Sequence, residues 1–418
     1  MATVETGSTL PTEVTSTGMS FSETFVTTTG TPGGGGAAAL FSVQPETSAA
    51  VLKNMAQHKI PQELNKRITD ITAEDSTILL VRLRLDRLTD RQLLDLRLCD
   101  LPLQIRGTQL EQRIEKLYRE LEARSLRFKP HIWLSEEWFT PDGVAGFAIP
   151  FYLAHPRLMK LERAQMLEVE GGSEGECMRI LRHEAGHAID NAFKLHSKTS
   201  WTDVFGSYRV PYPEWYQPQP GSRDYVFNLD AWYAQAHPAE DFAETFAVWL
   251  KPGNQWQRQY HRWGAQRKLE YVDLIMKKLI GQRLGRAKRH EVESLSSLKK
   301  TLREHYRKKR AYYTIHWPAS YERNLYRVFS HETRRRQSHP SAAQFLRHHR
   351  DEISHIVAQG TGVHNYTINH IVKHMIVRCR EQNLRVTIPE AEARQLILVT
   401  LTMQVMQVLR TGYHRIPL

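Results

Sequence analysis

Residues 173–193, SEGECMRILRHEAGHAIDNAF, constrain the fold more than any other stretch, because they predict one long helix with polar residues at its centre. Ser173 and Glu176 have the spacing of a capping box, in which each side chain satisfies a free backbone N–H group at the helix start. No proline interrupts the stretch, and an apolar stripe recurs at helical spacing through Met178, Leu181, Ala185 and Ala188. We therefore expect a helix from about residue 174 to residue 193.

The centre of this predicted helix carries the pattern HEAGH, with His183 and His187 four residues apart. Residues at this spacing project from the same helix face, about 6 Å apart along the axis, so both imidazoles can reach one ion. Glu184 is rotated by roughly 100° from His183, which suits a base beside a zinc-bound water better than a third ligand. In a chain with 20 His, such a string arises by chance about once in twenty chains, so a third ligand is needed to support a zinc site.

Two known arrangements of the third ligand do not fit the sequence. A metzincin requires Gly and His at three and six residues after the second His, where this chain has Asp190 and Phe193. The thermolysin-type Glu-x-x-x-Asp, about twenty residues downstream, is absent before a proline-rich loop that we expect over residues 207–227. Asp190 is more typical of an ordinary helix-face carboxylate than of a group supporting a ligand.

The stretch HPAEDFAETFAVWL offers a better third ligand on a second helix, which we expect to begin after Pro238. Glu240 and Glu244 lie four residues apart, and two carboxylates on one helix face repel each other unless a cation lies nearby. We predict that Glu240 binds zinc and that Glu244 accepts the free ring N–H of a ligating His. The alternative is an exposed acidic helix face without a metal.

The pattern HEAGHAID followed by ExxAExFA resembles the gluzincin-type zinc-binding metallopeptidase family, and its layout is similar to the catalytic domain of anthrax toxin lethal factor. The likeness covers about residues 61–285. It implies that His183, His187 and Glu240 bind zinc and that Glu184 is the general base. The lethal-factor comparison also implies a role for Tyr233, seven residues before Glu240, as a donor to the oxyanion. Trp232 or His237 could equally face the cleft, and an aromatic residue at this position is more often a packing residue.

The rest of the chain predicts an α+β fold, with a zincin-like metallopeptidase domain followed by a mostly α-helical basic domain. Residues 1–60 are rich in Thr, Ser and Gly, and we expect a disordered tail rather than an export signal. Residues 61–285 would form the metallopeptidase domain, and residues 286–418 the basic helical domain. Strands are expected at Thr77–Leu85, His131–Phe139 and Gly146–His155, the last as an edge strand because of Pro150. The expected helices include one opened by Thr108 and Glu111 and three after Ser341.

The net charge of +12 belongs mainly to residues 281–350, which contain 18 Lys and Arg against five Asp and Glu. Basic runs such as YRKKR, with tyrosines interspersed, could track phosphates and stack bases. An acidic protein partner, or simply a solvated helix face, explains the same residues, and the latter is the commonest outcome. We therefore expect nucleic acid to be an improbable partner of this segment and keep an acidic partner open.

The three cysteines, Cys99, Cys177 and Cys379, fit neither a disulfide framework nor a Cys-based zinc site, which favours a reducing, cytoplasmic compartment. The longest apolar stretch, Leu396–Leu409, is too short to cross a bilayer and predicts a buried helix. The sequence thus predicts a zinc metallopeptidase that hydrolyses peptides or proteins, with Glu184 as general base. The alternative is a nucleic-acid or partner-binding protein built on an inactive zincin scaffold.

Overall fold

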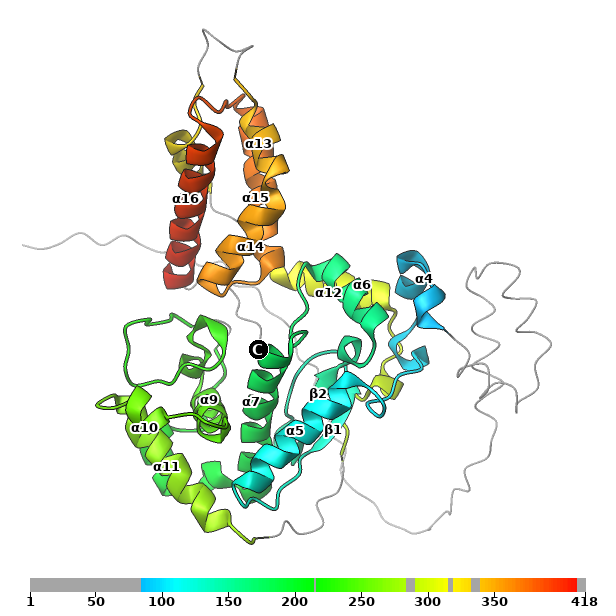
Figure 1. Cartoon of the computed structure of the whole chain (residues 1–418), viewed down its shortest axis with the longest axis vertical. Coiled ribbons are helices and arrows are strands. Elements are labelled where there is room, and N and C mark those ends of the chain that lie inside the picture. Colours follow the sequence, from blue (N-terminus) through cyan, green and yellow to red (C-terminus); the bar gives the residue numbers. More distant parts are fainter. Residues whose placement is uncertain (1–83, 214–215, 283–289, 315–318, 332–338, 412–418) are drawn as a thin grey trace, which may run out of the picture. The chain divides into compact units, whose positions relative to one another are not determined.

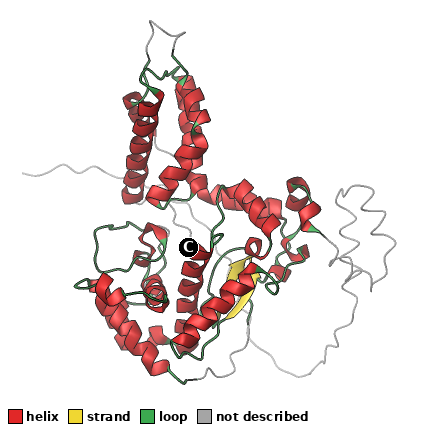
Figure 2. Ribbon diagram, viewed as in Figure 1, coloured by secondary structure: helices red, strands yellow, loops and turns green. Residues whose placement is uncertain are grey.

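A computed structural model of the chain describes residues 84–213, 216–282, 290–314, 319–331 and 339–411 (Figure 1). These residues are mainly helical, with one small two-stranded sheet (Figure 2). The predicted tail 1–60 and nearly all of the strand expected at Thr77–Leu85 lie outside the described residues. At the end of that expected strand, Leu85–Arg87 forms a short 3-10 turn, η1, before helix α4 (Asp90–Leu94).

Helix α5 (Gln109–Ala123) begins where the sequence predicts. The side chain of its N-cap, Thr108, accepts a hydrogen bond from the Glu111 N–H group, and Glu111 in turn accepts from the Gly107 N–H group. The apolar face expected for this helix is buried, through Leu110, Ile114, Leu117 and Leu121. Between α4 and α5, residues Leu98–Asp100 form a second 3-10 turn, η2.

The sheet consists of β1 (His131–Ser135) and β2 (Gly146–Pro150), which run parallel with His131 opposite Gly146. The connecting segment folds back along the second side of β2, where Ala148 donates its N–H to the Phe139 carbonyl. The middle of β2 is therefore flanked on both sides, and all its residues are buried. In this two-stranded sheet β2 is an edge strand, as expected, although its middle is covered by this one bridge.

Both strands begin at the predicted residue but end earlier than predicted, at Ser135 and Pro150. Residues expected to continue the second strand to His155 instead form the 3-10 helix η3 (Phe151–Ala154). Pro156 then occupies the first turn of helix α6 (Pro156–Met166), and His155 caps it by accepting the Arg157 N–H group. Proline is well suited to a first helical turn, so the chain changes to helix here rather than extending the sheet.

Helix α7 (Glu174–Phe193) and helix α9 (Pro238–Leu250) match the two predicted site helices and pack against each other (Figure 1). The predicted proline-rich loop lies between them in the chain. The remaining elements of this region are η4 (Leu195–Ser197), α8 (Thr199–Phe205), η5 (Asp230–Gln235), α10 (Trp256–Gln259) and α11 (Gly264–Leu279).

The C-terminal third continues with η6 (Leu295–Ser297), α12 (Leu302–Tyr313), η7 (Ala319–Arg327), α13 (Ala342–His348), α14 (Arg350–Thr361), α15 (Asn365–Glu381) and α16 (Glu390–Thr411). Four helices therefore follow Ser341 rather than three, because the chain breaks at His349 between α13 and α14. Helix α16 was expected to be buried, yet Val399 is 57 % exposed and Met403 is 62 % exposed. Its opposite face packs inward through residues such as Leu401, so the helix is half-buried.

The described residues form two large apolar cores and one small cluster around Tyr216 and Ala236 within the compact unit Glu74–Leu418. The first extends from Leu85 to Tyr306 and surrounds α7 and α9, and the second extends from Leu325 to Leu409. Leu295 and Leu302 pack in the first core, beyond the residue 285 at which we placed the end of the metallopeptidase domain. The domain boundaries themselves stay predictions.

The basic run YRKKR lies on α12, and it is only partly solvated, because Arg307 and Lys308 are exposed while two of its residues are not. Tyr306 and Lys309 are buried, so Tyr306 is a core residue rather than a platform for a base. Most of GRAKRH and all of TRRRQ lie outside the described residues. No helix in the described ranges is both long enough and apolar enough to span a membrane.

Candidate metal centre

Helices α7 and α9 come unusually close at Gly186, the glycine of HEAGH. A Cβ atom at this position would lie 2.9 Å from the Ala243 Cα atom, a distance that real Cβ atoms essentially never show. The absence of a side chain therefore lets the two helix backbones approach. This approach brings the first turn of α9, with Glu240, next to His183 and His187 at the middle of α7.

The three predicted ligands converge on one point. The Nε2 atoms of His183 and His187 are 3.1 Å apart, and Glu240 Oε2 lies 3.0 Å from the first and 3.2 Å from the second. His183 and Glu240 are buried, while the His187 side chain is 16 % exposed. Together they form a His–His–Glu group that could hold a metal ion.

Glu244 fixes the orientation of His183, as the sequence predicts. Its Oε1 atom lies 2.8 Å from His183 Nδ1 and also accepts a 2.8 Å hydrogen bond from the Asn228 side chain. Its Oε2 atom accepts the Leu229 N–H group at 2.7 Å. Because an ionised carboxylate can only accept, Nδ1 of His183 carries a proton, and a neutral His183 would then present the Nε2 lone pair to the metal.

The electrostatics of this cluster favour a cation at the point of convergence. Burial alone would lower the pKa of His183, but hydrogen bonds to Glu240 and Glu244 outweigh it and raise that pKa to about 10. Burial disfavours the charged form of Glu240, yet His187 and His183 hold the pKa of this carboxyl group well below its usual range. Without a metal, His183 therefore retains a proton on its ring.

Glu184 lies beside the triad but outside it, with its carboxylate held by a residue from the loop after β1. Thr140 Oγ1 donates to Glu184 Oε2 at 2.7 Å. The other carboxylate oxygen, Oε1, has no hydrogen bond to another described residue. Burial raises the pKa of Glu184, against the opposing effect of His183 and His187. This geometry leaves one oxygen of a buried carboxylate available to a water or a substrate.

Tyr212, in the proline-rich loop, is a site residue that the sequence did not identify. Its hydroxyl donates to Glu240 Oε1 at 2.8 Å, and its ring stacks on His237 at 3.9 Å between centroids. His237 in turn caps α9 and lies 2.8 Å from the Val210 carbonyl through its Nε2 atom. The loop thus holds the carboxylate of Glu240 with its other oxygen, Oε2, toward the two imidazoles. No local pattern distinguishes Tyr212 from Tyr208 or Tyr216.

Tyr233 lies next to His183, with 5.6 Å between the ring centroids. It follows two residues in the left-handed region, Ala231 at φ 58° and Trp232 at φ 56°, a conformation that costs non-glycine residues free energy. Its hydroxyl forms no hydrogen bond with another residue in the described part of the chain. The alternative candidate His237 is committed to capping α9, so it does not compete for this position.

Asp190 is neither an exposed helix-face carboxylate nor a partner of the triad. It is buried, and it accepts hydrogen bonds from the backbone N–H group and the ring Nδ1 atom of His196. This contact fixes the end of α7 to the turn that follows. As expected, Asp190 does not support a ligand of the triad, but it is a buried structural carboxylate rather than a plain one on the helix face.

Comparisons with known proteins find no match: no family model, no curated protein and no solved structure aligns significantly with this chain. The family resemblance therefore rests on the residues of the site itself.

Proposed function

We propose that this chain is a zinc-dependent metallopeptidase, in which His183, His187 and Glu240 hold the ion and Glu184 is the general base. The observation that carries the proposal is the convergence of three donor atoms from two helices beside a buried carboxylate that is not one of them. That division between ligands and base is typical of enzymes that activate water at a zinc ion.

The donor geometry fits zinc. Zinc bound by His and Glu has bond lengths of about 2.0 to 2.2 Å in a tetrahedron, which places neighbouring donors about 3.3 Å apart. The observed separations of 3.0 to 3.2 Å are close to this value. A set of two imidazoles and one carboxylate also leaves a fourth position open, as in catalytic rather than structural zinc sites.

A zinc ion bound here would polarise a scissile carbonyl and make a water molecule more acidic. Glu184 would take a proton from the attacking water through its free Oε1 atom and later return it to the leaving amine nitrogen. Thr140 holds the other oxygen, so the carboxylate keeps one orientation through both transfers. Gln at this position would keep the shape but could not accept the proton.

The position of Tyr233 next to His183 supports a role for it in the same reaction. Its hydroxyl is a free donor in the described structure, whereas the Tyr212 hydroxyl is already used on Glu240. We propose that Tyr233 donates to the oxyanion that forms on the scissile carbonyl and that Tyr212 keeps Glu240 in position. Binding of an acidic partner through residues 281–350 and a cytoplasmic location also remain proposals.

The proposal can be tested with Glu184→Gln and, as a matched control, Glu174→Gln on the exposed first turn of the same helix. Metal content would be measured by mass spectrometry and cleavage with a mixed-sequence peptide library. We expect both variants to keep zinc, with cleavage falling by at least about a hundred-fold in Glu184→Gln alone. Loss of zinc from Glu184→Gln, or its unchanged activity, would contradict the assigned role.

A further inference from the structure

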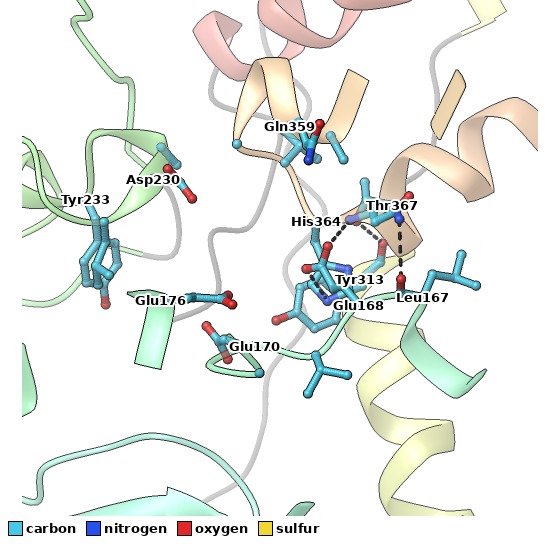
Figure 3. A pocket seen from close by; sticks show the side chains of 18 of the residues that line it. Leu167, Glu168, Glu170, Glu176, Asp230, Tyr233, Tyr313, Gln359, His364 and Thr367 are labelled. Carbon is cyan, nitrogen blue, oxygen red and sulfur yellow. Dashed lines mark hydrogen bonds and ion pairs between the residues drawn. The ribbon is translucent and has the colours of Figure 1, made fainter. Parts of the chain in front are cut away.

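A cavity of about 500 Å³ opens beside the candidate metal centre (Figure 3). His183, Glu184 and Tyr233 line one part of it, and the loop before α7 lines another. Residues of α14, α15 and α16 complete its far wall. A substrate held at the metal centre would therefore extend one of its side chains into this space.

Two carboxylates in the cavity wall, Glu170 and Glu176, lack a cationic partner among the described residues. Glu176 lies in the first turn of α7, where its backbone N–H group donates to the Ser173 hydroxyl at 3.3 Å. Burial raises the pKa of Glu170 to about 8 against the lowering effect of Lys309, and nearby carboxylates, including Glu176, also raise it. Figure 3 shows both side chains in the cavity. Two half-buried carboxylates this close need positive charge between them to be stable as anions.

Two other carboxylates of the same cavity differ, because each has a cationic partner. Glu168 forms a 2.9 Å ion pair with His364, and Asp230 lies 3.6 Å from Arg179. Glu170 and Glu176 form no such ion pair within the described residues, although Lys309 acts on Glu170 and Arg179 on Glu176 from a longer distance.

A buried donor of the same wall also lacks a partner. Trp138 is only 8 % exposed, and its indole N–H group has no hydrogen bond among the described residues. Its ring lies against Gly171, where a Cβ atom would come within 2.9 Å of it. Buried polar groups are normally paired, so an unpaired donor beside two carboxylates points to a ligand that carries both a carbonyl and a positive charge.

The opposite wall comes from α14, α15, α16 and the turn between α14 and α15, and it contains an apolar patch that includes Val363, Ile371 and Val405 beside polar residues such as Gln359 and Thr367. Two contacts hold it in place. Asn365 donates its N–H group to Glu168 at 2.9 Å, and Gly362 approaches the turn at Ala231 so closely that a Cβ atom would lie 3.1 Å from the Ala231 nitrogen. The cavity thus joins an apolar patch to a pair of carboxylates, which matches a side chain with a long aliphatic stem and a cationic end.

We propose that this cavity is the specificity pocket of the peptidase and takes a Lys or Arg side chain, with its charged end between Glu170 and Glu176. The inference rests on the proposed function, because it names the substrate class of that site. It also gives the C-terminal helices a part in substrate binding, since they supply the wall for the aliphatic stem.

Binding can be measured apart from cleavage with the full-length, zinc-loaded Glu184→Gln variant, which would leave a peptide intact. The probes are fluorescein-labelled Ala/Gly peptides in which a single Arg is moved stepwise along the sequence. Each probe is paired with the same peptide carrying norleucine, which has a similar aliphatic stem and no charge. At one position we expect Arg to bind about ten-fold or more tightly than norleucine, because a charge-assisted hydrogen bond replaces an apolar end.

In the Glu184→Gln background, adding Glu170→Gln and Glu176→Gln should abolish that preference, and Glu174→Gln should preserve it, because Glu174 lies outside the cavity wall. Zinc content and thermal unfolding would verify that each variant folds, and Glu170→Gln alone provides the same readout if the double substitution does not. Equal binding of Arg and norleucine at every position, or a preference that survives both substitutions, would overturn the pocket assignment. A preference for Arg without cleavage by the unmutated chain would contradict the peptidase proposal instead.

Discussion

Two of the buried clusters of carboxylates and cationic or imidazole side chains in the described residues differ in how their charges are compensated. Around α12, Lys309 lies 3.0 Å from Glu137 and 3.1 Å from Glu162, so a lysine supplies the positive charge. Around α7 and α9, no described Lys or Arg contacts Glu184, Glu240 or Glu244, and three donor atoms converge on one point instead. Burial of His and Glu is thus common to both, whereas only the second cluster has a His–His–Glu group that could hold a metal ion among the described residues.

This comparison explains why the same residue types lead to different predictions. Glu136, in the α12 cluster, is paired with Lys300 and with His305, whose Nδ1 atom is 3.1 Å from its carboxylate. That cluster stabilises the packing of α12 and has no donor set that converges on an empty point. The α7–α9 cluster, by contrast, holds the His183 imidazole through Glu244 and the Glu240 carboxylate through Tyr212. The following predictions separate the two clusters.

The largest effect should come from the ligand carboxylate. Replacing Glu240 with Gln removes a charged zinc ligand and leaves two imidazoles, which are too few for tight binding. We expect about one zinc per chain in the unmutated protein and almost none in Glu240→Gln after dialysis, measured by mass spectrometry. The matched control is Glu162→Gln, the same change in the α12 cluster, which should keep its zinc. Equal zinc contents in these two variants would remove the distinction between the clusters.

The next largest effect concerns folding stability. Lys309→Met would leave Glu137 and Glu162 without their buried cation, which should lower the free energy of unfolding by about 3 to 5 kcal/mol. Denaturant titration would measure it. Lys308→Met, on the exposed side of the same helix, should change stability by no more than about 0.5 kcal/mol. Zinc content should stay the same in both variants. If the two variants had similar free energies of unfolding, Lys309 would not be compensating the charges of Glu137 and Glu162.

A smaller effect is expected for Glu244→Gln, because Glu244 orients a ligand without touching the metal. Loss of such a partner typically weakens metal affinity by about 10- to 100-fold. Competition with a zinc chelator would measure the affinity, and the zinc content at saturating metal should remain about one per chain. An affinity unchanged from that of the unmutated protein would show that the contact with His183 does not contribute to binding.

The smallest effect is a pH dependence in the α12 cluster. Burial would raise the pKa of Glu136, but hydrogen bonds from His305 and Lys300 lower it from 4.5 to about 2. A carboxyl group whose pKa is lower in the folded state stabilises the fold above its unfolded pKa and loses that effect as the pH falls. Glu136→Gln should therefore be less stable than the unmutated chain at neutral pH, by about 1 kcal/mol, and the difference should shrink between about pH 4.5 and pH 2. Thermal unfolding across this range measures it, and a pH-independent difference would contradict the assignment.

The sequence predicts the parts of the site that depend on local spacing. The helix expected from about 174 to 193 is observed as Glu174–Phe193, and the second helix begins at Pro238 as expected, because caps and apolar periodicity are properties of neighbouring residues. The positions of Glu240 and Glu244 are predictable for the same reason. Because they are four residues apart on one helix, both carboxylates face α7, where Glu240 lies beside the two imidazoles and Glu244 accepts the ring N–H group of His183.

The rest depends on contacts between distant residues, which no local pattern encodes. Thr140 reaches Glu184 from a loop 44 residues away, and Tyr212 reaches Glu240 from a loop 28 residues away. The basic run around Lys309 is typical of a solvated helix face, but this lysine is buried and pairs with Glu137, which is 172 residues earlier in the chain. The wall that α14 to α16 add to the cavity is a further long-range feature. These contacts arise from tertiary packing, and the structure is needed to find them.

The central claim is that one zinc ion is bound by two imidazoles and one carboxylate, and X-ray absorption spectroscopy of the purified full-length protein tests it most directly. The account predicts only nitrogen and oxygen neighbours at about 2.0 to 2.2 Å, with the scattering pattern of two imidazole rings. Repeating the measurement on His187→Ala should show the loss of one ring. A sulfur neighbour at about 2.3 Å would place the metal on cysteine. That result, or a protein that retains no zinc, would contradict the site described for α7 and α9.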